Sequence, residues 1–225
     1  MTTKFWSMDI RVDDRTVIVF DLDDTLYNEM EYLRSAYIQI AKELDSENWQ
    51  ALFARMYSLF RSKEDVFEFV SAEYRGDKNA LIQQYRAHIP KLHLFDGVLD
   101  TIQQIKAKNG KIGIITDGRS TTQRVKLKSL GILDLIDKIV ISEEIGSEKP
   151  DEKNYLAIEE TFTNCNYLYM ADNLRKDFVT PNKRGWKTIG LVDNGLNMHY
   201  DGHSYFKESH EPKQFIVSFN ELNIV

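Results

Sequence analysis

The feature that most limits the fold of this chain is a regular alternation of apolar runs and helical patterns beyond residue 95. An earlier run at residues 17–20 is apolar on both faces, as expected of a strand buried within a parallel sheet. Strands joined by single helices predict an α/β fold, a Rossmann-like doubly wound parallel sheet. The later strands are expected at residues 111–115, 138–141, 167–171 and 186–192, and the helices between them at residues 98–109, 121–130, 151–162 and 174–184.

A block of helical periodicity separates the first strand from the others. Apolar residues recur at steps of three and four from Met30 onward, and the pattern continues to Ile89. Breaks divide the block into about four helices. We therefore expect an inserted α-helical cap at residues 28–94, with the core formed by residues 1–27 and 95–225. Because the insertion follows the carboxyl end of a strand, where open parallel sheets bind ligands, it is placed to act as a lid.

The two ends of the chain carry weaker signals. Residues 1–15 are polar and weakly patterned, and we expect a short leader there. Residues 193–214 support no assignment, residues 215–217 are typical of a late edge strand, and residues 218–221 are typical of a capping box.

Composition excludes several classes of protein. The 29 Lys and Arg against 35 Asp and Glu give a net charge of −6, so no net positive field attracts nucleic acid or an anionic membrane. The single cysteine, Cys165, excludes an internal disulfide, which suits a reducing compartment. Since neither a signal-peptide pattern nor a run of 18 apolar residues occurs, we expect a cytoplasmic protein. The sequence makes no prediction of oligomeric state.

The strongest chemical signal is a pair of acids directly after the first strand. Asp21 and Asp23 lie two residues apart, so both carboxylates can face the same side of the loop. Paired acids are costly unless a cation or a proton separates their charges. The alternative is an ordinary acidic turn in which an Asp caps the next helix.

Three more polar motifs follow later strands. A Thr-Asp-Gly turn at residues 116–118 leads into a helix whose N–H groups could bind an anion, or it is a simple capping turn. Lys149 precedes a proline, and Asp172 and Asp177 follow a strand, where acids also favour a helix N-terminus. Each motif has an ordinary explanation, but their gathering at one sheet edge predicts a shared crevice.

In this order, the motifs resemble those of the haloacid dehalogenase-like hydrolase superfamily. The similarity runs over residues 16–222, with residues 17–26 its most specific part. A cap between the first and second motifs is similar to the helical-cap branch of the family. The resemblance implies a Mg²⁺-dependent phosphatase that hydrolyses a phosphate monoester, a small phosphorylated metabolite, through an aspartyl-phosphate.

The resemblance also implies a role for each motif residue. Asp21 would be the nucleophile, Asp23 the general acid and base, and Lys149 a catalytic cation. Thr116 would join Lys149 in catalysis and in holding the phosphoryl group. The other substrate-binding positions implied are Asp117 and Gly118.

Four acids would form the metal site. Asp21 and Asp172 would bind Mg²⁺ through their side chains, Asp23 through its backbone carbonyl, and Asp177 would support them. Two positions depart from the family pattern. Ala171 stands where glycine is usual, which crowds the metal site, and Asp117 stands where asparagine is frequent.

Three alternatives stay open. A phosphomutase would use the same core but hold a bisphosphate intermediate away from water. A haloacid dehalogenase also attacks through an aspartate, but its halide leaving group needs neither a proton nor Mg²⁺, which Asp23 and Asp172 argue against. A non-catalytic binding protein is disfavoured because every family-matched catalytic position is filled.

Overall fold

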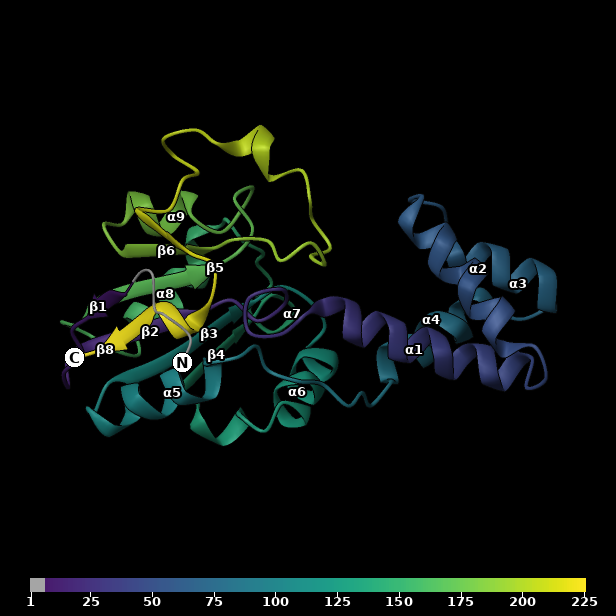
Figure 1. Cartoon of the computed structure of the whole chain (residues 1–225). Helices are drawn as coiled ribbons and strands as arrows, with labels where there is room; N and C mark the ends of the chain where they lie inside the picture. Colours follow the sequence, from purple (N-terminus) through teal and green to yellow (C-terminus); the bar gives the residue numbers. More distant parts are fainter. Residues whose placement is uncertain (1–6) are drawn as a thin grey trace.

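Six parallel strands form the centre of the molecule in this computed structural model, which describes residues 7–225 (Figure 1). Their order across the sheet is β4-β3-β2-β5-β6-β7, so the chain builds outward from β2 first to one side and then to the other. The order therefore reverses between β2 and β5, and the predicted doubly wound fold is confirmed. The bounds are β2 Thr16–Phe20, β3 Lys111–Thr116, β4 Lys138–Ile141, β5 Asn166–Ala171, β6 Lys187–Leu191 and β7 Gln214–Ile216.

Side chains of β2 alternate between two separate cores, one on each face of the sheet. Ile18 and Phe20 pack with α5 (Val98–Ala107) and α6 (Ser120–Ser129). Val17 and Val19 pack with residues of α8 (Glu152–Glu159) and with Phe178 beside α9 (Val179–Lys183). All five residues of β2 are buried, as expected of the central strand in a three-layer sandwich. The ends of this strand are consequently fixed from both sides.

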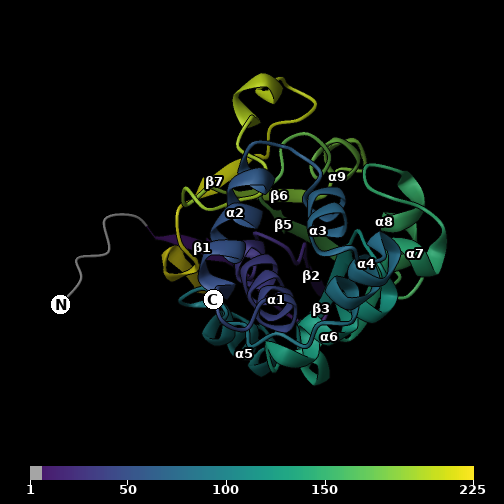
Figure 2. The ribbon, with the colours of Figure 1, turned by 90° about the vertical axis from the view of Figure 1, so that its right-hand side faces the viewer.

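The chain between β2 and α5 contains four helices with a core of their own. These are α1 (Glu29–Leu44), α2 (Trp49–Arg61), α3 (Val66–Tyr74) and α4 (Lys78–Ala87). Their buried cluster includes Tyr37, Met56 and Val70 and is separate from both cores of the sheet. Figure 1 shows these helices beyond the edge toward which the arrowhead of β5 points, and Figure 2 shows them in front of that edge. We call them the cap; they face the carboxyl ends of the strands.

Two expectations were wrong. The helix expected at residues 174–184 is only α9, because Pro181 lies in its first turn and lacks the N–H that a longer helix would need. Part of the expected leader is a strand: β1 (Met8–Ile10) pairs in parallel with β8 (Leu222–Ile224). Residues 1–6 of that leader lie outside the described residues.

The remaining segments are short. The expected edge strand at residues 215–217 corresponds to β7, and Ser218 caps the turn η3 (Phe219–Glu221) by accepting from the N–H of Asn220. The small helices are α7 (Ser142–Ile145), η1 (Leu133–Leu135) and η2 (Gly202–Tyr205). Within residues 7–225, no helix combines the length and apolar character that crossing a membrane requires.

Candidate active site

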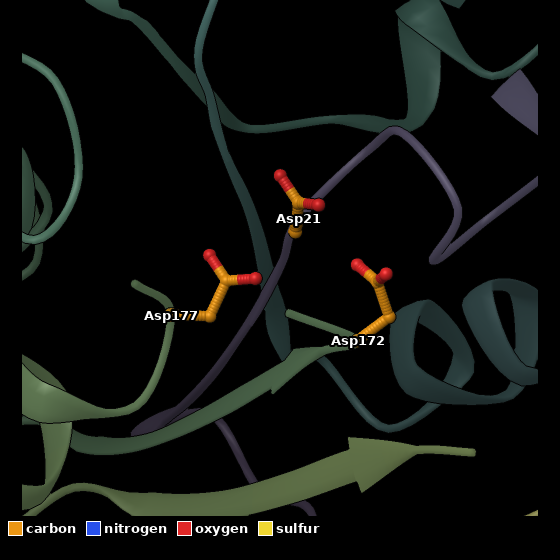
Figure 3. Close-up of side chains that lie close together, drawn as sticks. All are labelled: Asp21, Asp172 and Asp177. Atoms are coloured by element: carbon orange, nitrogen blue, oxygen red, sulfur yellow. The ribbon is translucent and has the colours of Figure 1, made fainter. Parts of the chain in front are cut away.

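Three carboxylates meet where the strand order reverses. Asp21 directly follows β2 and its N–H donates to the carbonyl of Met170 in β5, while Asp172 directly follows β5. Together with Asp177, these residues offer carboxylate oxygens that all lie within 4.8 Å of one another (Figure 3). Open parallel sheets bind ligands at this kind of position. The structure therefore brings together three of the four acids that the sequence assigned to a metal.

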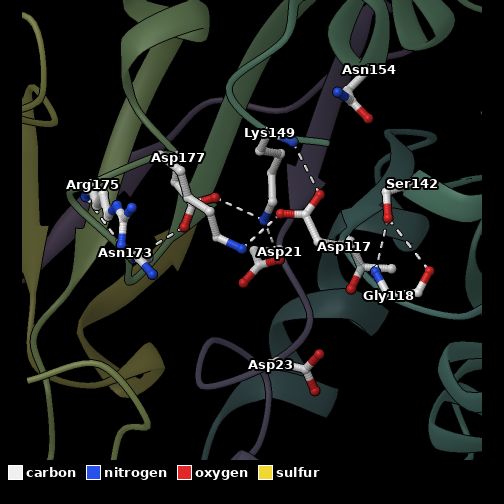
Figure 4. A network of polar contacts seen from close by, with 12 residues as sticks. Asp21, Asp23, Asp117, Gly118, Ser142, Lys149, Asn154, Asn173, Arg175 and Asp177 are labelled. Atoms are coloured by element: carbon white, nitrogen blue, oxygen red, sulfur yellow. Dashed lines mark hydrogen bonds and ion pairs between the residues drawn. The ribbon is translucent and has the colours of Figure 1, made fainter. Parts of the chain in front are cut away.

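A buried lysine joins two of these acids. Figure 4 shows Lys149 between the two acids. Its Nζ lies 2.5 Å from Asp21 and 2.7 Å from Asp177, and its side chain has no exposed surface. Burial alone would lower the pKa of Lys149, but Asp177 and Asp21 outweigh it and raise that pKa well above its ordinary value. Lys149 is therefore a permanent positive charge inside the acid cluster.

One ammonium does not compensate all three acids. Burial, with Asp177 and Asp21 nearby, raises the pKa of Asp172 well above its ordinary value, and burial raises the pKa of Asp21 to about 7 despite Lys149. Among the described residues, Asp172 has no cationic partner; its oxygens accept from the Thr25 hydroxyl at 3.2 Å and the Asn197 amide at 2.9 Å. Carboxylate oxygens suit Mg²⁺, and the uncompensated charge of Asp172 fits a divalent cation.

Asp23 lies apart from these acids and faces α6. Its carboxylate accepts hydrogen bonds from Tyr27 at 2.5 Å, Lys126 at 2.6 Å and Gln123 at 2.8 Å. Burial would raise the pKa of Asp23, but Lys126 and the other donors lower it below its ordinary value. The side chain of Asp23 is not part of the three-acid group.

The turn after β3 supplies the Thr116 hydroxyl and also hydrogen bonds that hold neighbouring loops in place. Thr116 is buried at the end of β3. The Asp117 carboxylate accepts from the backbone N–H of Lys149 at 3.0 Å and from Lys176 at 2.7 Å, so it fixes the lysine loop. The N–H of Gly118 donates to the Ser142 hydroxyl at 2.9 Å. That N–H, expected to face the substrate, therefore already has a protein acceptor.

The acids open into a small cavity below the cap. It measures about 210 Å³, and its walls include Asp21, Asp23, Thr116 and Asp172. A second cavity of about 520 Å³ shares Glu29 and His199 with it and extends between the cap and the loop after β6. A further cavity of about 630 Å³ lies around residues 163–167, away from the acids. The small cavity beside the acids thus adjoins the larger one at the cap.

Sequence reasoning missed the partners that hold the acids in place. Thr25 donates toward both Asp21 and Asp172, and α6 supplies Gln123 and Lys126 to Asp23. The two α6 residues are three positions apart on a helix and so share a face. Two polar residues at that spacing, just beyond the motif at residues 116–118, were the signal in the sequence that pointed to these partners.

The family comparison covers most of the chain. The family described as haloacid dehalogenase-like hydrolase matches residues 18–191. The chain is 26% identical over 197 residues to a glyceraldehyde 3-phosphate phosphatase of Methanocaldococcus jannaschii, covering 78% of this chain and 84% of that protein. It is 27% identical over 201 residues to a ribulose-1,5-bisphosphate 5-phosphatase of Halopiger xanaduensis, covering 77% and 83%.

Solved structures show the same fold. A phosphatase of this family from Thermococcus onnurineus superposes with a TM-score of 0.60 at 20% identity, over 92% of this chain and 95% of that one. The resemblance inferred from the motifs is confirmed, because the family match spans residues 18–191 of a 225-residue chain. The chain belongs to the haloacid dehalogenase-like hydrolase family.

Proposed function

We propose that this protein is a Mg²⁺-dependent phosphatase that hydrolyses the phosphate monoester of a small metabolite through an aspartyl-phosphate on Asp21. The grouping of Asp21, Asp172 and Asp177 around the buried Lys149 carries the proposal, with Asp21 and Asp172 lining the cavity below the cap. The named relatives support the substrate class, since both are phosphatases of small phosphorylated compounds.

The chain's own residues divide the reaction into two steps. Asp21 attacks phosphorus, and Asp23 gives a proton to the leaving oxygen; Asp23 then takes a proton from the water that releases phosphate. Lys149 holds Asp21 in place and adds positive charge beside the phosphoryl group. The hydroxyl of Thr116 binds one of its oxygens.

Asp21 and Asp172 would hold Mg²⁺ through their side chains and Asp23 through its carbonyl, with Asp177 in support. When bound, the cation reduces the repulsion between the acids and the phosphate. Within the described residues, the only charge-matched partner of Asp177 is Lys149, which suits a supporting role.

The test is a screen of phosphorylated metabolites with Mg²⁺ or with EDTA, comparing wild type, Asp21→Asn and a control. Asp14→Asn is a matched control because Asp14 is an exposed acid before β2. Asp21→Asn should retain less than about 10⁻³ of the wild-type kcat, and acid-quenched wild type should carry phosphate on the peptide containing Asp21.

Product analysis separates the phosphatase from a phosphomutase. Release of inorganic phosphate at the rate of substrate loss supports hydrolysis, whereas an isomeric phosphate ester as the product contradicts it. Hydrolysis at the wild-type rate by Asp21→Asn, or undiminished turnover in EDTA, would also be incompatible with the proposal.

A further inference from the structure

Two buried residues on α6 hold the side chain of Asp23. Gln123 and Lys126 lie three residues apart on one face of α6 and are 2% and 3% exposed. The Nε2 of Gln123 donates to Oδ2 of Asp23, and the Nζ of Lys126 donates to Oδ1, which also accepts from the Tyr27 hydroxyl. Oδ1 thus receives two donors and Oδ2 only one. Oδ2 retains the free lone pair.

Gln123 makes a second contact that links two motifs. Its Nε2 lies 2.5 Å from the hydroxyl oxygen of Thr116. The orientation of this amide is determined by Asp23, because the reversed amide would place its carbonyl oxygen against a carboxylate oxygen. Since Gln123 donates to Thr116, the Thr116 hydroxyl keeps its own proton for another acceptor. Thr116 lines the cavity, so that proton is available to a phosphoryl oxygen.

Lys126 is compensated from two parts of the molecule. Its ammonium lies 2.6 Å from Asp23 and 3.4 Å from Glu29, the first residue of α1 in the cap. It also lies 5.0 Å from the ring centre of Tyr32 in α1 and 5.9 Å from that of Tyr27. A buried ammonium is tolerated where such partners replace water. Lys126 therefore fixes Asp23 relative to both the core and the base of the cap.

We propose that Gln123 and Lys126 are positioning residues that aim Oδ2 of Asp23 at the leaving oxygen, and that Gln123 also orients the Thr116 hydroxyl toward the phosphoryl group. The proposal rests on the proposed function of this site. In the first step, the Asp21–phosphorus bond forms, the bond to the leaving oxygen breaks, and the proton on Oδ2 moves to that oxygen. In the second, water oxygen bonds to phosphorus, the Asp21–phosphorus bond breaks, and a water proton returns to Oδ2.

The experiment compares substrates that differ in their need for a proton. The assays use two kinds of substrate. The leaving group of 4-nitrophenyl phosphate departs as a stable anion, whereas that of an alkyl phosphate needs a proton. Both are tested with wild type, Lys126→Met and Gln123→Met. Lys128→Met is the matched control, because Lys128 is exposed on the same helix. Thermal unfolding of each variant verifies that it is folded.

Removal of Lys126 should affect the proton transfer through the placement of Oδ2. Lys126 lowers the pKa of Asp23, so its loss would by itself favour the protonated acid, and a slower reaction therefore reports a misplaced carboxyl group. Because general acid catalysis contributes about 10²–10⁴-fold, Lys126→Met should lose about 100-fold in kcat on alkyl phosphates and less than about tenfold on 4-nitrophenyl phosphate. Gln123→Met should show the same difference between substrates on top of a uniform loss, since it also releases Thr116. Lys128→Met should match wild type on both.

Equal losses on both kinds of substrate would overturn the positioning role, as would wild-type kinetics in Gln123→Met. Gln123→Met changes no charge and nearly preserves side-chain volume, so it decides the question if Lys126→Met does not fold. Failure of the proposed function would look different: wild type itself would then hydrolyse no phosphate ester in the presence of Mg²⁺.

Discussion

At the scale of single residues, the site is a balance of buried charges. Lys149 has no exposed side-chain surface and is shared between Asp21 and Asp177, while Asp23 has its own cation in Lys126. Removing one member of a buried ion pair leaves the other without compensation. Each lysine therefore supports both the fold and the placement of one acid.

The Lys149→Met substitution tests this balance. It should lower the free energy of unfolding by about 3–5 kcal/mol in EDTA, because Asp21 and Asp177 lose their buried partner. Urea unfolding measures the loss, and Lys187→Met, at an exposed lysine in β6, is the control. A loss no larger than that of Lys187→Met would show that the buried pairs contribute nothing to stability.

At the scale of elements, glycines with a positive φ stand at the ends of two helices. Gly97 precedes α5 with a φ of +86°, and a Cβ there would lie 2.7 Å from the side-chain oxygen of Asn220 and 2.9 Å from its backbone nitrogen. Gly131, after α6, has a φ of +71° but no atom within 4 Å of such a Cβ. Comparing substitutions at the two glycines therefore separates the energetic cost of backbone strain from that of steric overlap.

Alanine substitutions at these glycines should differ in cost. Gly131→Ala should destabilise by about 1–2 kcal/mol, the cost of a left-handed conformation alone. Gly97→Ala should lose about 1–3 kcal/mol more, because α5 must also move away from η3. Denaturant unfolding of both variants measures the difference. Equal losses would mean that η3 shifts freely to make room.

At the scale of the whole molecule, binding of the proposed cation would be coupled to stability. The acid cluster joins residues that follow β2 and β5 and is complete only when the sheet is folded. A ligand that binds only the folded state stabilises it by mass action. If the cluster holds the proposed Mg²⁺, the arrangement of the sheet edge would thus link Mg²⁺ affinity to the unfolding temperature.

Asp172→Asn should be at least as stable as wild type without Mg²⁺ and less stable than wild type with Mg²⁺. In EDTA the variant should unfold at the same temperature or higher, because a carboxylate without a cationic partner is removed. At Mg²⁺ concentrations about 100-fold above the dissociation constant, wild type should gain about 2.7 kcal/mol and the variant little. Differential scanning calorimetry measures this, with NaCl at matched ionic strength as control. Equal gains in both proteins would contradict a role for Asp172 in metal binding.

By itself, the sequence determined the strands of the six-stranded sheet, the helical block after β2 and the acids at the strand ends, because these depend on local periodicity and short motifs. Only the tertiary structure decided the long-range pairings. The segment Met8–Ile10 is too short to show a strand pattern of its own and becomes β1 only by pairing with β8. Asp23 meets Gln123 and Lys126 across about one hundred residues. Such contacts follow from strand order and burial, since packing the whole chain brings α6 beside the loop after β2.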